Sequence, residues 1–141
     1  MSFDWSQYFD VAKELAEQAQ KAPLPLQEAK YRAAISRAYY SAFGKARNHL
    51  RYNDKIREPA PLIDSNGERM NIHQYVREAF MNSSDQDRIE IGANLDRMAK
   101  NRNVADYDLY NVILNNLPFT VQVTLQWAKD VLSALNHIQK K

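Results

Sequence analysis

The stretch that decides the fold is LQEAKYRAAISRAYYSAFGKARNHLRYN, residues 26–53, the longest regular pattern in the chain. Its apolar residues recur at three- and four-residue steps, which places them on one arc of a helix at about 100° per residue. These residues are Tyr31, Ile35, Tyr39, Ala42, Phe43, Ala46 and Leu50. The opposite side carries a polar stripe of Lys30, Arg37, Ser41, Gly44, Asn48 and Arg51. This stripe predicts either a solvated face or a face turned to a partner chain or a ligand groove.

The segments on both sides of this helix are predicted from the same rules. Apolar residues between Asp4 and Lys21 also recur at three- and four-residue steps, so a first helix is expected there. Pro23 and Pro25 separate the two helices, because proline breaks a helix interior and suits a first turn. Residues 54–67 contain two further prolines and an Asp-Ser-Asn-Gly turn, which predicts a surface loop.

Three further helices are predicted after the loop. They cover about Ile72–Phe80, Gln86–Asn101 and Pro118–Gln139. The last one has an apolar arc wider than a surface helix needs, which indicates packing between other helices or against a second subunit. Since no strand pattern occurs, we expect an all-α, antiparallel bundle of four long helices with one or two short extra helices, forming a single domain over residues 1–141.

The composition limits the class of protein. A length of 141 residues fits one domain, and 45% hydrophobic with 26% charged residues is typical of a soluble globular protein. The net charge of +2 permits RNA binding without demanding it. No window approaches the roughly 18 apolar residues of a membrane span. The chain has no cysteine, and its first residues lack a secretion-signal pattern, so we expect a cytoplasmic protein without disulfides.

Common catalytic motifs are missing. Three glycines cannot build a phosphate-cradling loop, and neither a Gly-x-Ser-x-Gly nor a His-Glu-x-x-His pattern occurs, so no metal or other cofactor is expected. His49 falls on the apolar arc of residues 26–53, where a core histidine is the simpler interpretation. His73 opens a short helix after the loop, a position from which it could reach a cleft.

Arg102 is the most informative charged residue. Four-, three- and four-residue steps place it on one helix face with Ile91, Leu95 and Met98, so it continues an apolar stripe. A desolvated arginine needs an anionic partner, because an unpaired buried charge costs several kcal/mol. That partner is either Asp106 or a phosphate. Nearby Asn103, Tyr107 and Tyr110 add donors and rings of the kind that hold single-stranded RNA.

Three motifs together resemble the HEPN domain (higher eukaryotes and prokaryotes nucleotide-binding) in its prokaryotic branch. They are Arg32-Ala33-Ala34-Ile35-Ser36-Arg37-Ala38-Tyr39-Tyr40-Ser41-Ala42-Phe43, then His73, then Arg102-Asn103-Val104-Ala105-Asp106-Tyr107. The resemblance covers most of the chain. It implies an all-α bundle that forms a homodimer and that is often encoded beside a small nucleotidyltransferase as a toxin and antitoxin pair.

The resemblance also implies a site. Active members of the superfamily are metal-independent endoribonucleases, in which an arginine, the polar residue after it and a histidine separated by four to six residues come from both subunits. Arg102 and Asn103 match the first two, but Tyr107 stands where the shortest spacing would put the histidine, and Asp106 precedes it. The predicted catalytic positions are therefore Arg102, Asn103, Asp106 and Tyr107. The predicted ligand-binding residues are Arg37, Tyr40, His73 and Tyr110.

Three functions remain open from the sequence. The first is a homodimeric RNA- or nucleotide-binding protein, or a toxin–antitoxin subunit, whose ribonuclease motif is degenerate. The second is an active endoribonuclease toxin that uses Arg102 in a cleft between two subunits. The third is a purely structural helical dimer.

Overall fold

The computed structural model describes residues 3–107 and 116–139, and this part of the chain is all-helical, as predicted. Its α-helices are α1 (Gln7–Ala19), α2 (Leu24–Asn48), α3 (Ile72–Met81), α4 (Gln86–Tyr107) and α5 (Leu117–Gln139). A π-helical turn, η1 (His49–Asn53), extends α2. Within the described ranges the extended backbone amounts to one isolated bridge between Ile63 and Arg69 in the predicted loop. The finer HEPN-like arrangement remains a prediction.

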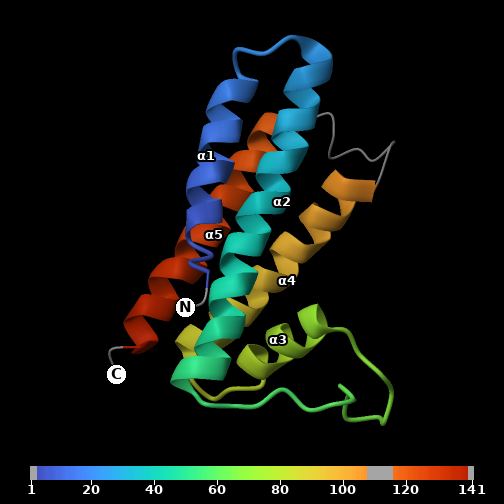
Figure 1. Ribbon diagram of the computed structural model, residues 1–141, viewed down its shortest axis with the longest axis vertical. Helices are drawn as coiled ribbons and strands as arrows, with labels where there is room; N and C mark the ends of the chain where they lie inside the picture. The colour runs from blue at the N-terminus through green and yellow to red at the C-terminus, as the bar shows by residue number, and fades with distance from the viewer. Residues whose placement is uncertain (1–2, 108–115, 140–141) are drawn as a thin grey trace.

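Helix α2 is the centre of the fold. It packs against α1, α4 and α5, whereas α3 packs mainly on α4. Figure 1 shows α1 and α2 side by side, joined by a short connection, with α5 behind them and α4 tilted across the bundle above α3. The main core lies between these helices, and the fully buried Tyr39, Phe80, Leu95 and Met98 belong to it. No helix in residues 3–107 or 116–139 is long and apolar enough to cross a membrane.

The break between α1 and α2 forms where the two prolines predict it. Pro23 takes the extended N-cap position of α2, and a proline follows in the first turn. The Gln27 side-chain amide donates to the carbonyl oxygen of Ala19 at 3.0 Å, which satisfies one of the free carbonyl groups at the end of α1. This bond ties the two helix ends together.

The polar stripe of α2 is not a solvated face throughout. Ser41 and Gly44 are buried, and the Trp5 side chain lies so close to Gly44 that an added Cβ would overlap its ring. The Ser41 hydroxyl is satisfied within α2, because it donates to the carbonyl oxygen of Ala38 at 2.7 Å. Small residues on this side make room for the N-terminal segment of the same chain, so the stripe here faces neither solvent nor a ligand groove.

Helix α4 is longer than predicted. The expected end was Asn101, but the helix continues to Tyr107. No glycine or proline occurs between these positions, so nothing in the covalent structure stops the helix. Arg102 to Tyr107 therefore form its last turns, with Arg102 and Asp106 one turn apart on the same face. The residues that follow the predicted end at Asn101 thus belong to a regular helix.

Candidate functional site

Arg102 lies where the stripe of α4 predicts. Ile91, Leu95 and Met98 are fully buried on this stripe, and the Arg102 side chain that follows them is only 11% exposed. The last turns of α4 thus bring a guanidinium group to the edge of an apolar face.

The partners of the Arg102 guanidinium are incomplete. Its Cζ atom lies over the rings of Tyr39 and Tyr40, 5.4 and 5.6 Å from their centres, within cation–π range. Its nearest carboxylate oxygen, on Asp106, is 3.8 Å from Nη1, which is an ion pair but too long for a hydrogen bond. Its Nε atom is buried and has no hydrogen-bond partner in the described part of the chain. The Arg102 charge is therefore stabilised by the two rings and by Asp106, but not all of the Arg102 N–H donors are hydrogen-bonded.

Helix α2 supplies a second such arginine. Arg32 donates from Nη1 to the carbonyl oxygen of Ala105 at 2.8 Å, and its buried Nε has an ion-pair contact with Glu28 at 3.7 Å but no hydrogen bond. One turn further along α2, the Ser36 hydroxyl lies 3.4 Å from Asp106. In residues 3–107 and 116–139, these two Nε atoms are the buried side-chain polar atoms that lack a hydrogen-bond partner.

Both unused donors thus belong to one place, the line of contact between the two helices. We refer to it as the α2–α4 seam. Its residues are Arg32, Ser36, Tyr39, Tyr40, Arg102 and Asp106.

Helix α3 places His73 beside the seam. The Tyr39 hydroxyl and Nδ1 of His73 are 2.7 Å apart, and the His73 ring stacks on Phe43 at 4.4 Å between ring centres. Burial, mainly, raises the pKa of Tyr39 to about 12, so its hydroxyl keeps its proton. Burial also lowers the pKa of His73, and the nearby charges of Arg102, Arg77 and Arg47 lower it further.

With these pKa directions, Tyr39 is a neutral phenol and His73 a neutral imidazole at pH 7, and the direction of the hydrogen bond between them depends on which ring nitrogen of His73 carries the proton. One ring nitrogen of His73 is taken up by Tyr39. The two guanidinium groups make the site rich in donors and suited to an oxyanion.

The structure gathers some of the predicted site residues and separates others. Arg102, Asp106, Tyr40 and His73 lie together. Arg37 does not join them, because it is exposed and its guanidinium lies over the Tyr8 ring on α1, 5.1 Å from the ring centre.

Two further predicted residues make no contact with this group. Asn103 is exposed and Tyr107 is 75% exposed, and no hydrogen bond, ion pair or ring contact joins either to the seam within the described residues. Asn103 and Tyr107 each follow a seam residue by one position, about 100° further around the helix, which turns both side chains away from the seam. Tyr110 lies outside the described residues.

Sequence reasoning missed Arg32, Ser36 and Tyr39 as site residues. The four-residue steps from Arg32 to Ser36 and Tyr40 were a usable signal, because they put these side chains on one face of α2. Arg77 and Arg47 carried no such signal, since only the packing of α3 and the end of α2 brings their charges near His73.

Comparison with known proteins adds no identification. No family model matches the chain, and no curated protein or solved structure is significantly similar to it. In the described part of the chain, no group of histidine, aspartate and glutamate side chains could hold a metal ion.

Proposed function

We propose that this chain is a HEPN-like, RNA- or nucleotide-binding protein in which the α2–α4 seam receives a phosphate group. The observation that carries the proposal is the pair of buried, unused Nε donors of Arg32 and Arg102. A buried donor without a partner costs about 1–3 kcal/mol, and a phosphate oxygen would recover this cost. A guanidinium fork also matches the paired oxygens of a phosphate.

The surroundings of the donors suit a nucleotide better than a free inorganic anion. The rings of Tyr39 and Tyr40 lie against Arg102, and the His73 ring lies beside both tyrosines. Because Asp106 is 3.8 Å from Arg102, it balances part of the positive charge without occupying the donors. A ligand phosphate would therefore compete with a weak internal partner.

The same geometry favours binding over cleavage. Attack by a ribose 2′-hydroxyl needs a proton acceptor within hydrogen-bond reach. Nδ1 of His73 is already hydrogen-bonded to Tyr39, while Tyr107, at the position of the expected histidine, is 75% exposed and makes no contact with the seam among the described residues. We therefore place the binding protein with a degenerate motif ahead of the active endoribonuclease.

The proposal includes the partners that the resemblance implies. They are a second copy of the chain and a small nucleotidyltransferase, as in a toxin–antitoxin pair. Light scattering tests the homodimer, and the neighbouring reading frame tests the paired system. A monomer in solution, or an unrelated neighbouring gene, would remove the respective partner from the proposal while leaving the phosphate site to its own test.

The phosphate site is tested with two variants that act on the same ion pair. Fluorescence anisotropy measures the affinity for a single-stranded RNA of about 12 nucleotides, a length within the usual site sizes of single-strand binders. Arg102→Gln removes the charged contact, so binding should weaken about 10- to 100-fold, the equivalent of about 1.5–3 kcal/mol. Asp106→Asn removes the competing carboxylate, so binding should strengthen.

The opposite signs of these effects distinguish a ligand site from a structural pair. If Arg102 and Asp106 only hold the helix end, both variants should lower the melting temperature and neither should change RNA affinity. Gel analysis of the RNA after incubation gives the third result. Metal-free cleavage by the wild type that Arg102→Gln abolishes, without loss of fold, would replace the binding proposal with the endoribonuclease.

A further inference from the structure

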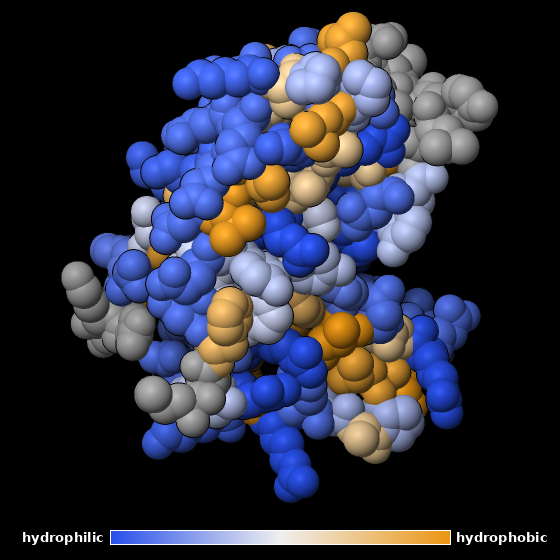
Figure 2. Space-filling model, turned by 45° about the horizontal axis from the view of Figure 1, so that its top comes forward, coloured by the Kyte–Doolittle hydropathy of each residue, from blue (hydrophilic) through white to orange (hydrophobic). Residues whose placement is uncertain are grey.

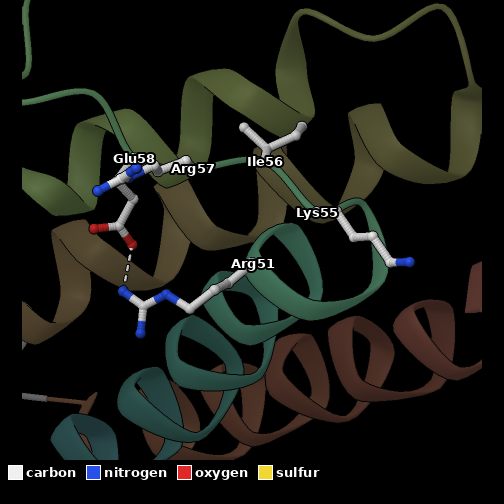
Figure 3. Close-up of a pocket in the computed structure, with 5 residues that line it drawn as sticks. All are labelled: Arg51, Lys55, Ile56, Arg57 and Glu58. Atoms are coloured by element: carbon white, nitrogen blue, oxygen red, sulfur yellow. Dashed lines mark hydrogen bonds and ion pairs between the residues drawn. The ribbon is translucent and has the colours of Figure 1, made fainter.

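A second basic surface lies at the opposite end of α2. Just after η1, the chain forms a pocket of about 430 Å³ whose lining contains three cations and one carboxylate. The lining residues are Arg51, Lys55, Ile56, Arg57 and Glu58. We refer to these five residues as the η1 pocket (Figure 3).

The carboxylate of the η1 pocket is fully engaged by arginines. Glu58 accepts from Arg47 at 2.7 and 3.0 Å and from Arg51 at 2.9 Å. The hydrogen bond from Arg47, chiefly, lowers the pKa of Glu58, so its charge is fixed. Lys55 and Arg57 are exposed and form no ion pair within the described residues. The pocket therefore has an excess of positive charge that no internal carboxylate balances.

The pocket is long and open. Figure 3 shows Arg51 directed at Glu58 at one end, whereas the Lys55 side chain extends away at the other end, with Ile56 between them. Tyr52 and Ile56 are 56% and 45% exposed, so apolar surface lies beside the charges. Separated cations with an exposed aromatic ring suit a phosphate chain with bases better than a single compact anion.

Arg47 connects the η1 pocket to the α2–α4 seam. It holds Glu58 by two hydrogen bonds on one side, and its charge lowers the pKa of His73 on the other. The Arg102 charge acts on the same histidine. Arg102 of the seam and Arg47, which holds Glu58 of the η1 pocket, are thus both close enough to His73 to lower its pKa. Figure 2 shows a mostly hydrophilic face with hydrophobic patches in its upper half and a larger one at its lower right, below a hollow on the right side.

We propose that the η1 pocket binds the phosphate backbone of the same single-stranded RNA whose other phosphate occupies the α2–α4 seam. This inference rests on the proposed function and extends it from one phosphate to a strand of several nucleotides. The seam supplies the buried contact, and the η1 pocket supplies exposed, salt-sensitive contacts.

The test uses a double variant that leaves the internal bonds intact. Lys55 has a φ of 58°, in the left-handed region, so Lys55→Asn removes the charge with a residue that tolerates this backbone. Arg57→Gln is combined with it. The matched control is Lys21→Gln with Lys129→Gln, which removes the same charge from exposed positions on other parts of the surface.

The readout is the affinity for a single-stranded RNA of about 12 nucleotides over a range of salt concentrations. Loss of two phosphate contacts should weaken binding about ten-fold and reduce the slope of log K against log salt by about 1.4, which is about 0.7 for each contact. The control should change neither by a comparable amount. A dinucleotide, which is too short to reach the η1 pocket from the seam, should bind the double variant and the wild type equally.

The outcomes separate the two proposals. If Arg102→Gln weakens binding but the η1 double variant behaves like the control, the strand path is overturned and the phosphate site stands. If the double variant weakens binding of the longer RNA while Arg102→Gln has no effect, the η1 pocket binds the backbone but the seam is not its phosphate site, which overturns the joint path.

Discussion

Helix α4 carries two arginines with similar surroundings and different partners. Arg88, near its start, lies over the Phe80 ring at 5.5 Å, and Arg102, near its end, lies over the Tyr39 ring at 5.4 Å. Each has a histidine nearby whose pKa is lowered mainly by burial. Arg88, however, donates to both oxygens of Asp54 at 2.7 and 2.8 Å, whereas Arg102 faces its carboxylate at 3.8 Å.

The two arginines differ in whether their N–H donors already have acceptors within the chain. Arg88 also lies 3.3 Å from Nε2 of His49, so its fork is filled from within the chain. Asp54 is the residue after η1, and the bidentate bond therefore fastens the start of the following loop to α4. Arg102 keeps a buried Nε without a partner in the described part of the chain. An arginine whose donors are all hydrogen-bonded within the chain has a structural role, whereas one with a donor left over can bind a ligand.

The largest expected effect is on stability. Arg88→Ala leaves a largely buried Asp54 without its charged donors, so the free energy of unfolding should fall by about 3 kcal/mol. Arg102→Ala removes a long ion pair and an unused donor, so the loss should be about 1 kcal/mol. Urea unfolding followed by circular dichroism measures both. An equal loss in the two variants would show that Arg102 is a structural tie as well.

A smaller effect on stability is expected at Tyr39 and Tyr40, whose rings contact Arg102. Tyr39→Phe removes the hydroxyl that is hydrogen-bonded to His73, which should cost about 1 kcal/mol, close to the net value of one hydrogen bond. Tyr40→Phe is the matched control, because no hydrogen bond of its hydroxyl occurs among the described residues, and its stability should be nearly unchanged. If the two variants unfold alike, His73 is not held by Tyr39.

The smallest expected effect is the pH dependence of the free energy of unfolding. The pKa values of His49 and His73 are lower in the folded protein than the ordinary 6.5, so below pH 6.5 the unfolded chain binds more protons. The stability that this difference gives is present above pH 6.5 and is lost as the pH falls through the folded pKa. Unfolding at a series of pH values should show this decline, and His49→Gln and His73→Gln should each flatten it.

RNA binding distinguishes the two histidines under the same conditions. A phosphate beside His73 favours its charged form, so RNA affinity should rise as the pH falls towards the pKa of this histidine. His73→Gln should abolish that rise, while His49→Gln should leave it in place, because His49 belongs to the Arg88 tie. The same pH profile in all three proteins would contradict a phosphate site next to His73.

Local periodicity predicted much of the fold and the key residue of the site. The steps from Ile91 to Met98 placed Arg102 at the edge of the core, and the structure leaves only 11% of its side chain exposed. The apolar arc of α2 likewise predicted a buried His49. In both cases the neighbours on the same helix determine the environment, so the sequence pattern is sufficient.

What periodicity could not predict depends on contacts between helices. Gly44 falls on a polar stripe, yet it is buried because a residue without a side chain admits Trp5 from a segment far away in the sequence. Helix α4 ends at Tyr107 and not at the predicted Asn101, because none of the charged and aromatic residues that follow Asn101 breaks a helix. The roles of Arg32 and Arg77 depend on the packing of α2 and α3 beside α4, which no single helix pattern contains.

The most direct measurement follows the unused donor itself. In a ¹⁵N-labelled sample, the Nε–H signals of Arg88 and Arg102, assigned with the variants above, are recorded while single-stranded RNA is added. The phosphate site predicts that the Arg102 signal moves as its Nε gains an acceptor, while the Arg88 signal stays in place. An Arg102 signal that stays unchanged at saturating RNA would contradict the site.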